Sequence, residues 1–264
     1  MQRIQYAVAA AMVVLTLPAI TPGFADEPSG TAIAVIQSTQ AVGASGDRVL
    51  VEQGDVYSGD KIVTGPIGQA QIKFRDNTKL VVGPNSTMSI DSFVYSGKSA
   101  QTFSIDAVKG TFRFITGISH KDAYSIATPT AVIAVRGTEF DFHVDWSGGL
   151  TEVVMFGGVT QICPKTLPDG SPNLHHEGCT LARQACGMTL VPSGGDTISQ
   201  LHASEQRNQL INTDFRYIRN QSGLDPQFQV NLTSCGAPAN FLNVPPPPPP
   251  GHSATPPPPP PVSE

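Results

Sequence analysis

Turn-forming residues punctuate the chain at short, regular intervals between residues 32 and 162. Short strands separated by turns at a spacing of roughly 8 to 12 residues are typical of an all-β sandwich, barrel or solenoid. Glycine and proline supply the positive or fixed φ angles that such turns require. The turns lie at Ser58-Gly59-Asp60, Gly65-Pro66, Arg75-Asp76-Asn77, Gly83-Pro84-Asn85, Ser96-Gly97, Lys109-Gly110, Arg136-Gly137 and Gly157-Gly158.

Between the turns, apolar and polar residues alternate with the period of two that marks a half-buried strand. Ala70, Ile72 and Phe74 share one face of such a strand. A second strand is predicted to place four apolar side chains inside and three polar ones on its wet side, namely Phe140, Phe142, Val144 and Trp146 against Asp141, His143 and Asp145. Residues 131–135 are apolar at every position, which predicts a central strand covered on both faces.

This pattern predicts an all-β fold, a short-stranded antiparallel roll, sandwich or solenoid-like domain over residues 26–162. Residues 163–240 follow as a cysteine-containing segment, with one or two strands between Thr180 and Val191 and a strand or tether from Val230 to Cys235. A helix is expected at about residues 202–220, where Ile211, Phe215 and Ile218 form an apolar stripe. Residues 241–264 are a proline-rich tail, predicted to be disordered and to adopt polyproline II conformations.

Residues 1–25 have the layout of a secretory signal peptide. Arg3 precedes an apolar run from Ala7 to Leu17, and small residues follow at Gly23 and Ala25. The run is shorter than the roughly 20 residues that span a bilayer. We therefore expect cleavage after Ala25, export to the periplasm or cell surface, and no transmembrane span in the mature chain.

The formal net charge of the chain is −5. Binding to nucleic acid relies on neutralising phosphates with lysine and arginine. The acidic balance therefore argues against a nucleic-acid partner.

The four cysteines all lie in the second half of the chain, and in an oxidising compartment they are expected to form two disulfides. Three pairings exist, and we favour a bridge within the loop that begins at Cys163, with Cys235 joined to the remaining cysteine. The alternative is a zinc site made by His175, His176, Cys179 and Cys186. Their spacing matches no compact two-plus-two ligand arrangement and exported thiols oxidise, so we expect no metal and no cofactor.

Six short segments, in this order from about residue 49 to 144, resemble the FecR domain family. They are Gly54-Asp55, Gly59-Asp60-Lys61-Ile62-Val63-Thr64, Gly83-Pro84-Asn85-Ser86, Val108-Lys109-Gly110-Thr111-Phe112, Thr128-Pro129-Thr130-Ala131 and Val135-Arg136-Gly137-Thr138-Glu139-Phe140. The resemblance implies an all-β periplasmic sensing or scaffold domain without catalytic residues or a required cofactor. The best-known members relay ferric-siderophore signals to a cytoplasmic sigma factor through a transmembrane helix and a cytoplasmic helical segment. Here a predicted signal peptide stands in place of both, so a direct anti-sigma function is not expected.

The motif residues are expected to shape the fold and not to form an active site. Arg136 follows five apolar residues, which predicts a buried guanidinium paired with Glu139 or Asp141. Gly137 is expected to bend the chain with a positive φ, so that Phe140 points inward. The full structural set is Gly59, Asp60, Gly83, Pro84, Asn85, Gly110, Thr128, Pro129, Arg136, Gly137, Thr138, Glu139 and Phe140.

Asp141, His143 and Asp145 are the one catalytic constellation in the sequence, because side chains on one strand face could form a general acid and base pair or a cation site. The same alternation is ordinary on a solvated sheet face, which we favour. The sequence contains no nucleophile elbow, phosphate-binding glycine loop or metalloprotease helix motif. No catalytic residue is assigned, and the protein is not expected to be an enzyme.

The leading hypothesis is an exported, non-enzymatic binding or scaffold protein that recognises a protein or polymer of the cell envelope. The alternative is a component of envelope signal transduction that acts through a membrane-bound partner.

Overall fold

Fifteen strands make up most of the computed structural model, which describes residues 27–44, 46–195, 198–202 and 204–235. They join one mixed sheet. The strands are β1 (Gly30–Ile36), β2 (Thr39–Gly43), β3 (Gly46–Val49), β4 (Asp55–Val56), β5 (Lys61–Thr64), β6 (Gln69–Phe74), β7 (Lys79–Val82), β8 (Thr87–Ser96), β9 (Ser99–Ile115), β10 (Tyr124–Ala127), β11 (Ala131–Val144), β12 (Leu150–Pro164), β13 (Thr180–Ala182), β14 (Met188–Pro192) and β15 (Ser199–Leu201).

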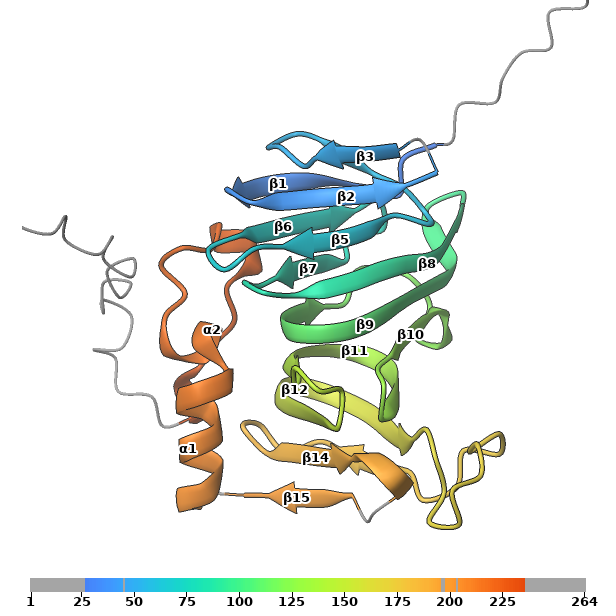
Figure 1. The fold of residues 1–264 in the computed structure, drawn as a ribbon, viewed down its shortest axis with the longest axis vertical. Helices are drawn as coiled ribbons and strands as arrows, with labels where there is room; N and C mark the ends of the chain where they lie inside the picture. Colours follow the sequence, from blue (N-terminus) through green and yellow to red (C-terminus); the bar gives the residue numbers. More distant parts are fainter. Residues whose placement is uncertain (1–26, 45, 196–197, 203, 236–264) are drawn as a thin grey trace, which may run out of the picture.

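Strands β9, β11 and β12 bend, and each of them contributes to two layers. Their pairing partners define the first layer as β4-β1-β6-β7 followed by residues 110–115 of β9, residues 139–144 of β11, residues 151–157 of β12, β14 and β15. The second layer is β3-β2-β5-β8 followed by the other half of β9, β10, the other halves of β11 and β12, and β13. Figure 1 shows the result as strands stacked from β3 at the top to β15 at the bottom.

The bend in β9 falls at Gly110, whose φ of 108° is open only to glycine without strain. A side chain there would also collide with the neighbouring corner, because an added Cβ would lie 2.5 Å from the Cα of Ser86. The corner of β11 falls at Gly137, with φ 70°. The predicted positive φ of Gly137 is therefore confirmed.

The main core lies between the two layers and is rich in phenylalanine. Phe112 and Phe142 stack with ring centroids 4.8 Å apart, and Phe103 meets Phe74 edge to face at 4.6 Å. Phe140 is fully buried, as predicted. Such pairs add about 0.5 to 1.5 kcal/mol each beyond the burial of their area.

The C-terminal segment covers the outer face of the first layer. Helix α1 (Glu205–Asp214) begins at Ser204, whose side chain accepts a hydrogen bond from Arg207 N, and α2 (Arg216–Arg219) follows after a break at Phe215. Figure 1 shows both helices standing beside the stacked strands. Phe215 and Ile218 are buried against the outer side chains of β9, β12 and β14.

Short 3₁₀ turns complete the path at η1 (Lys121–Ala123), η2 (Ser193–Gly195), η3 (Pro226–Phe228) and η4 (Thr233–Cys235). Two disulfides, Cys163–Cys179 and Cys186–Cys235, fasten the loop after β12 and the end of the C-terminal segment. This is the pairing that we favoured.

The predicted all-β class, the strands between Thr180 and Val191, and the C-terminal helix are confirmed, with four differences. β9 and β10 pair in parallel, and the helix is broken in two. Val230–Cys235, predicted as a strand or a tether, is not a strand and ends in a 3₁₀ turn. Residues 131–135 bury only alternate positions, because Val132 and Ala134 face outward and are half-buried.

The predicted signal peptide (1–25) and the whole of the predicted proline-rich tail (241–264) lie outside the described residues, as does the end of the C-terminal segment. Among the residues that are described, no helix has the length and apolar character needed to cross a membrane.

Candidate functional site

The motif residues Gly83, Pro84, Asn85 and Gly110 lie at neighbouring corners of the chain that are joined by hydrogen bonds. Asn85 N donates to Gly65 O at 3.0 Å, and Thr64 Oγ1 donates to Gly83 O at 2.5 Å. Thr111 N in turn donates to Ser86 Oγ at 3.1 Å, which joins the next corner at Gly110. These hydrogen bonds hold successive turns in register, as expected for residues with a structural role.

Two further motif residues, Asp60 and Thr128, accept hydrogen bonds from backbone N–H groups. Asp60 is 2% exposed, accepts from Tyr57 N at 2.7 Å and pairs with Arg48 at 2.5 Å. Thr128 Oγ1 accepts from Ala131 N at 2.9 Å and closes the turn that contains the exposed Pro129.

The prediction for Arg136 is wrong. Arg136 and Gly137 are exposed because the strand turns its corner there, and the guanidinium reaches water directly. Thr138, in contrast, is buried, and its backbone N donates to Thr116 Oγ1 at 2.9 Å. Glu139 is half-buried and lies opposite Ile115 of β9.

The buried ion pair joins Arg113 of β9 to Asp141 of β11. Both side chains are 0% exposed, with Nε to Oδ1 at 2.6 Å and Nη2 to Oδ2 at 2.9 Å. Burial raises the pKa of Asp141, and the two-point contact with Arg113 lowers it by less than burial raises it. Asp141 therefore does not lie on a solvated face, because the C-terminal segment covers it.

The Arg113 guanidinium also holds that segment in place. Its Nη1 donates to Gln221 Oε1 and to Phe228 O, and the guanidinium carbon lies 5.7 Å from the ring centroid of Tyr217. Gln221 then bonds both the N–H and the carbonyl oxygen of Val230. One arginine thus connects the β domain to both ends of residues 217–230.

Asp145 shapes the turn between β11 and β12. Its carboxylate accepts from Gly149 N at 2.7 Å, Leu150 N at 3.3 Å and Ser147 Oγ at 2.8 Å. The turn carries the single tryptophan of the chain, Trp146, which is 85% exposed. The prediction that Trp146 points inward is therefore wrong: the strand ends at Val144, and alternation ends with it.

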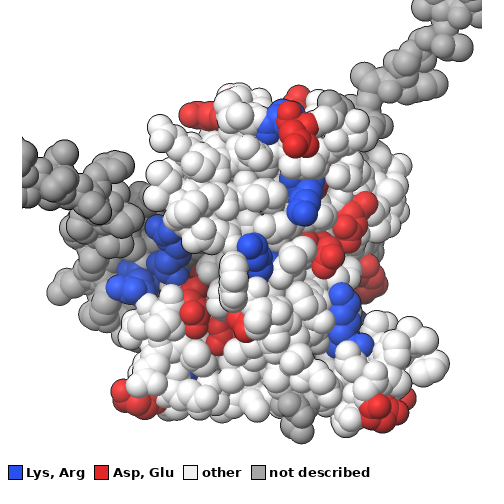
Figure 2. All heavy atoms as spheres, in the orientation of Figure 1, with Lys and Arg blue, Asp and Glu red and all other residues white. Residues whose placement is uncertain are grey.

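A small surface surrounds this tryptophan, and we call it the Trp146 surface. Lys109 Nζ lies 5.0 Å from the Trp146 ring centroid. Pro129, in the turn between β10 and β11, is exposed and lies close to Gly148 of the turn that carries Trp146. On the face shown in Figure 2, charged side chains form small groups of both signs between large uncharged areas.

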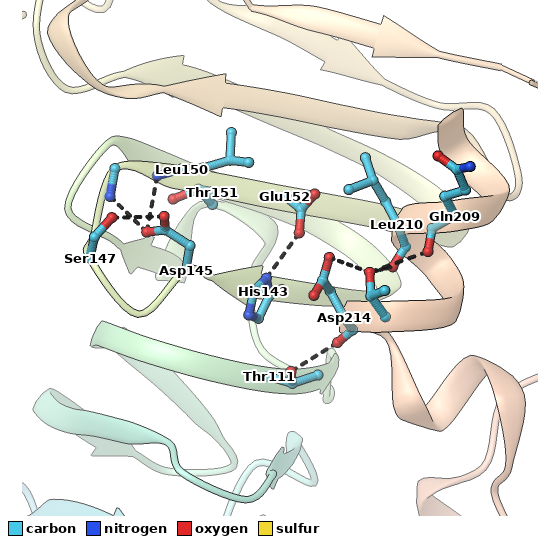
Figure 3. Close-up of polar contacts among 12 residues, drawn as sticks. Thr111, His143, Asp145, Ser147, Leu150, Thr151, Glu152, Gln209, Leu210 and Asp214 are labelled. Carbon is cyan, nitrogen blue, oxygen red and sulfur yellow. Dashed lines mark hydrogen bonds and ion pairs between the residues drawn. The ribbon is translucent and has the colours of Figure 1, made fainter. Parts of the chain in front are cut away.

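His143 faces Glu152 of β12 and Asp214 at the end of α1, instead of Asp141 and Asp145 (Figure 3). His143 Nδ1 and Glu152 Oε2 are 2.9 Å apart. Burial raises the pKa of Glu152, and the negative charges of Asp214 and Asp145 raise it further, while His143 lowers it. Thr111 Oγ1 donates to Asp214 O at 2.9 Å, which fixes the helix end beside the sheet.

The zinc alternative at His175, His176, Cys179 and Cys186 does not form. Cys179 and Cys186 belong to different disulfides, which leaves no thiolate for a metal. Both histidines are exposed on the loop closed by the Cys163–Cys179 bridge.

Sequence reasoning missed Arg113, Glu152 and Asp214. Arg113 sits between Phe112 and Phe114, so alternation assigned it to water, and nothing local showed that a segment more than 100 residues away covers it. Glu152 carried a weak signal, because it is an acidic residue inside the apolar run from Leu150 to Phe156.

Residues 60–160 match the protein family described as FecR protein. No curated protein matches the chain. Among solved structures, the chain is similar to a "putative anti-sigma factor" from Parabacteroides distasonis, seen in two crystal structures. The identity is 14% and the TM-score 0.42 in both, over 56% and 58% of this chain and 62% and 63% of that chain. This chain therefore spans less than two thirds of the length of that protein.

Proposed function

The chain carries a FecR domain over residues 60–160, and from this premise we propose that it is an exported, non-enzymatic protein that binds another protein of the cell envelope through the Trp146 surface. The observation that carries the proposal is Trp146 itself, a large aromatic side chain that is 85% exposed on a structured turn. Tryptophan is among the residues that most often dominate binding energy at protein interfaces.

The turn presents Trp146 rigidly, because Asp145 fixes the chain on either side of it with three hydrogen bonds. A pre-ordered turn loses little conformational entropy on binding. Lys109 beside the ring adds a cation, and the exposed Pro129 adds apolar area next to the turn that carries Trp146. Aromatic residues are enriched at the centres of protein interfaces, so an exposed tryptophan on an ordered turn suits a protein partner.

Export is supported by the two disulfides, Cys163–Cys179 and Cys186–Cys235. Disulfides persist in the periplasm and outside the cell and are rare in the cytosol. The partner would then be a periplasmic protein or the exposed part of a membrane protein.

A second candidate is a component of envelope signal transduction, and the FecR domain is the observation that favours it. In that case the partner is a membrane-bound sensor, and binding at the Trp146 surface changes its output. The two candidates differ in consequence, because a scaffold would alter envelope integrity and a signalling component would alter gene expression.

Site-specific photo-crosslinking tests the proposal. A photoreactive amino acid replaces Trp146 in the full chain, expressed in its own host, and a matched probe replaces Leu174, which is 78% exposed on the disulfide-closed loop. We expect the probe at position 146 to cross-link one discrete protein, and we expect the probe at position 174 not to cross-link that protein. Identical products from both positions, or none from 146, would contradict the proposal.

A further inference from the structure

Three side chains capable of binding a metal meet where α1 ends on the first layer. His143 of β11, Glu152 of β12 and Asp214 of α1 each offer one ligand atom, and these atoms all lie within 4.8 Å of one another. Figure 3 shows the Glu152 carboxylate above the His143 ring and the Asp214 carboxylate, which lie side by side. The cluster joins residues that are 9 and 62 positions apart in the sequence, so it exists only in the folded chain.

Glu152 provides a second observation that points to a ligand. Its side chain is 1% exposed, and Oε2 is engaged by His143. In the part of the chain that the structure describes, its other oxygen, Oε1, is the one buried side-chain N or O atom without a hydrogen-bond partner. A buried carboxylate oxygen without a partner is costly, and native proteins retain such groups mainly where a ligand or a functional role compensates.

The charge of the cluster selects the ligand. The cluster offers two carboxylate oxygens and one imidazole nitrogen within 4.8 Å of one another, which is a set of ligand atoms suited to a cation. A divalent cation would neutralise the pair, whereas a neutral molecule or an anion would not. One imidazole nitrogen with two carboxylate oxygens is a ligand set for zinc and related transition metals, while magnesium and calcium prefer oxygen alone.

We propose that His143, Glu152 and Asp214 bind a divalent transition-metal cation of the zinc type, which pins the end of α1 to strands β11 and β12. Zinc bonds to nitrogen and oxygen ligands are about 2.0 to 2.2 Å long, so tetrahedral ligand atoms lie roughly 3.4 Å apart. Asp214 is half-buried at a helix end and makes the closing movement. The three residues leave a fourth position for water or for a side chain of a partner.

Isothermal titration with Zn²⁺ tests this inference on the whole exported protein. The protein is first treated with EDTA, and Mg²⁺ serves as the comparison cation. We expect one Zn²⁺ per chain, no measurable Mg²⁺ binding at the same concentrations, and a melting temperature that rises with Zn²⁺ concentration. Removing one ligand in His143→Gln or Asp214→Asn should weaken Zn²⁺ binding by about tenfold or more. The matched control is the double change His175→Gln and His176→Gln, which should bind as the wild type does.

Glu152→Gln separates a metal ligand from a merely structural residue. The amide has nearly the same shape and removes a buried charge, so without metal we expect this variant to melt no lower than the wild type. With Zn²⁺ it should lose the rise in melting temperature. Three outcomes would each overturn the proposal. The wild type could fail to bind Zn²⁺, all three cluster variants could bind Zn²⁺ as the wild type does, or binding could disappear only in the control.

Discussion

Arg113 and Asp141 form the ionic contact on which the C-terminal segment depends. Arg113→Ala strands a fully buried Asp141 and also removes the hydrogen bonds to Gln221 and Phe228. Breaking a buried pair from one side typically costs about 3 to 5 kcal/mol, and chemical denaturation should show a loss of this size. Arg136→Ala is the control, since Arg136 is exposed and its removal should stay within about 0.5 kcal/mol.

The same pair allows a finer test of what the charges contribute. Replacing both residues together, as Arg113→Met with Asp141→Leu, removes two desolvated charges at once, so it should cost less than Arg113→Ala alone. A double variant that is less stable than Arg113→Ala would contradict this, because the unpaired Asp141 carboxylate would then not be the main cost of removing Arg113.

The raised pKa of Asp91 predicts that the stability of the fold depends on pH. Asp91 is exposed, but partial desolvation by its surroundings raises its pKa and Asp106 raises it further, while Lys165 lowers it. A carboxyl with a raised folded-state pKa favours the folded state only when protonated, so ionised Asp91 lowers stability at neutral pH. Asp91→Asn should therefore melt above the wild type at pH 7, and the difference should shrink as the pH falls through the raised pKa of Asp91. An unchanged or growing difference in melting scans at lower pH would refute this assignment.

At the scale of elements, the corner glycines decide whether a long strand can serve both layers. Gly97 and Gly110 both have positive φ, but an added Cβ at Gly97 meets nothing within 4 Å, whereas at Gly110 it meets Ser86. Gly97→Ala should cost about 1 kcal/mol from backbone strain. Gly110→Ala should cost about 2 to 4 kcal/mol, because overpacking adds to the strain. Equal losses in urea unfolding would mean that β9 does not need its stacked corner.

The strands were largely predictable from the sequence, because a period of two and turn-forming residues are local signals. Ala70, Ile72, Phe74 and Phe140 are all buried as predicted. The outward faces were not predictable in the same way. Arg113 and Asp141 have the pattern of solvated residues, and only the packing of a distant helical segment buries them.

The candidate sites were likewise predictable only in the part that depends on local sequence signals. Alternation placed His143 correctly on the outer side of β11, but its partners Glu152 and Asp214 come from other elements that only the fold brings close. Alternation also predicted a buried Trp146, because the pattern does not show that the strand ends at Val144.

At the scale of the whole molecule, the two disulfides should differ in their contribution to stability. The Cys186–Cys235 bridge closes a loop with a sequence separation of 49, and the Cys163–Cys179 bridge one with a separation of 16. Loop-closure entropy assigns roughly 4 kcal/mol to the longer loop and roughly 3 kcal/mol to the shorter one. Calorimetry of the paired alanine variants should therefore give the lower melting temperature for the 186/235 pair. The opposite order would mean that the C-terminal segment is held mainly by its packing and by Arg113.

We propose a division of roles in which the Trp146 surface recognises the partner, and the family-motif residues and the C-terminal segment stabilise the fold. The most direct test uses the partner that is captured by cross-linking at position 146. Its affinity is measured for three forms of this chain: the wild type, Trp146→Ala and Leu174→Ala. We predict that Trp146→Ala weakens binding by about thirtyfold, or roughly 2 kcal/mol, without a change in melting temperature. Leu174→Ala should bind as the wild type does. Equal affinity of the wild type and Trp146→Ala would contradict the central claim.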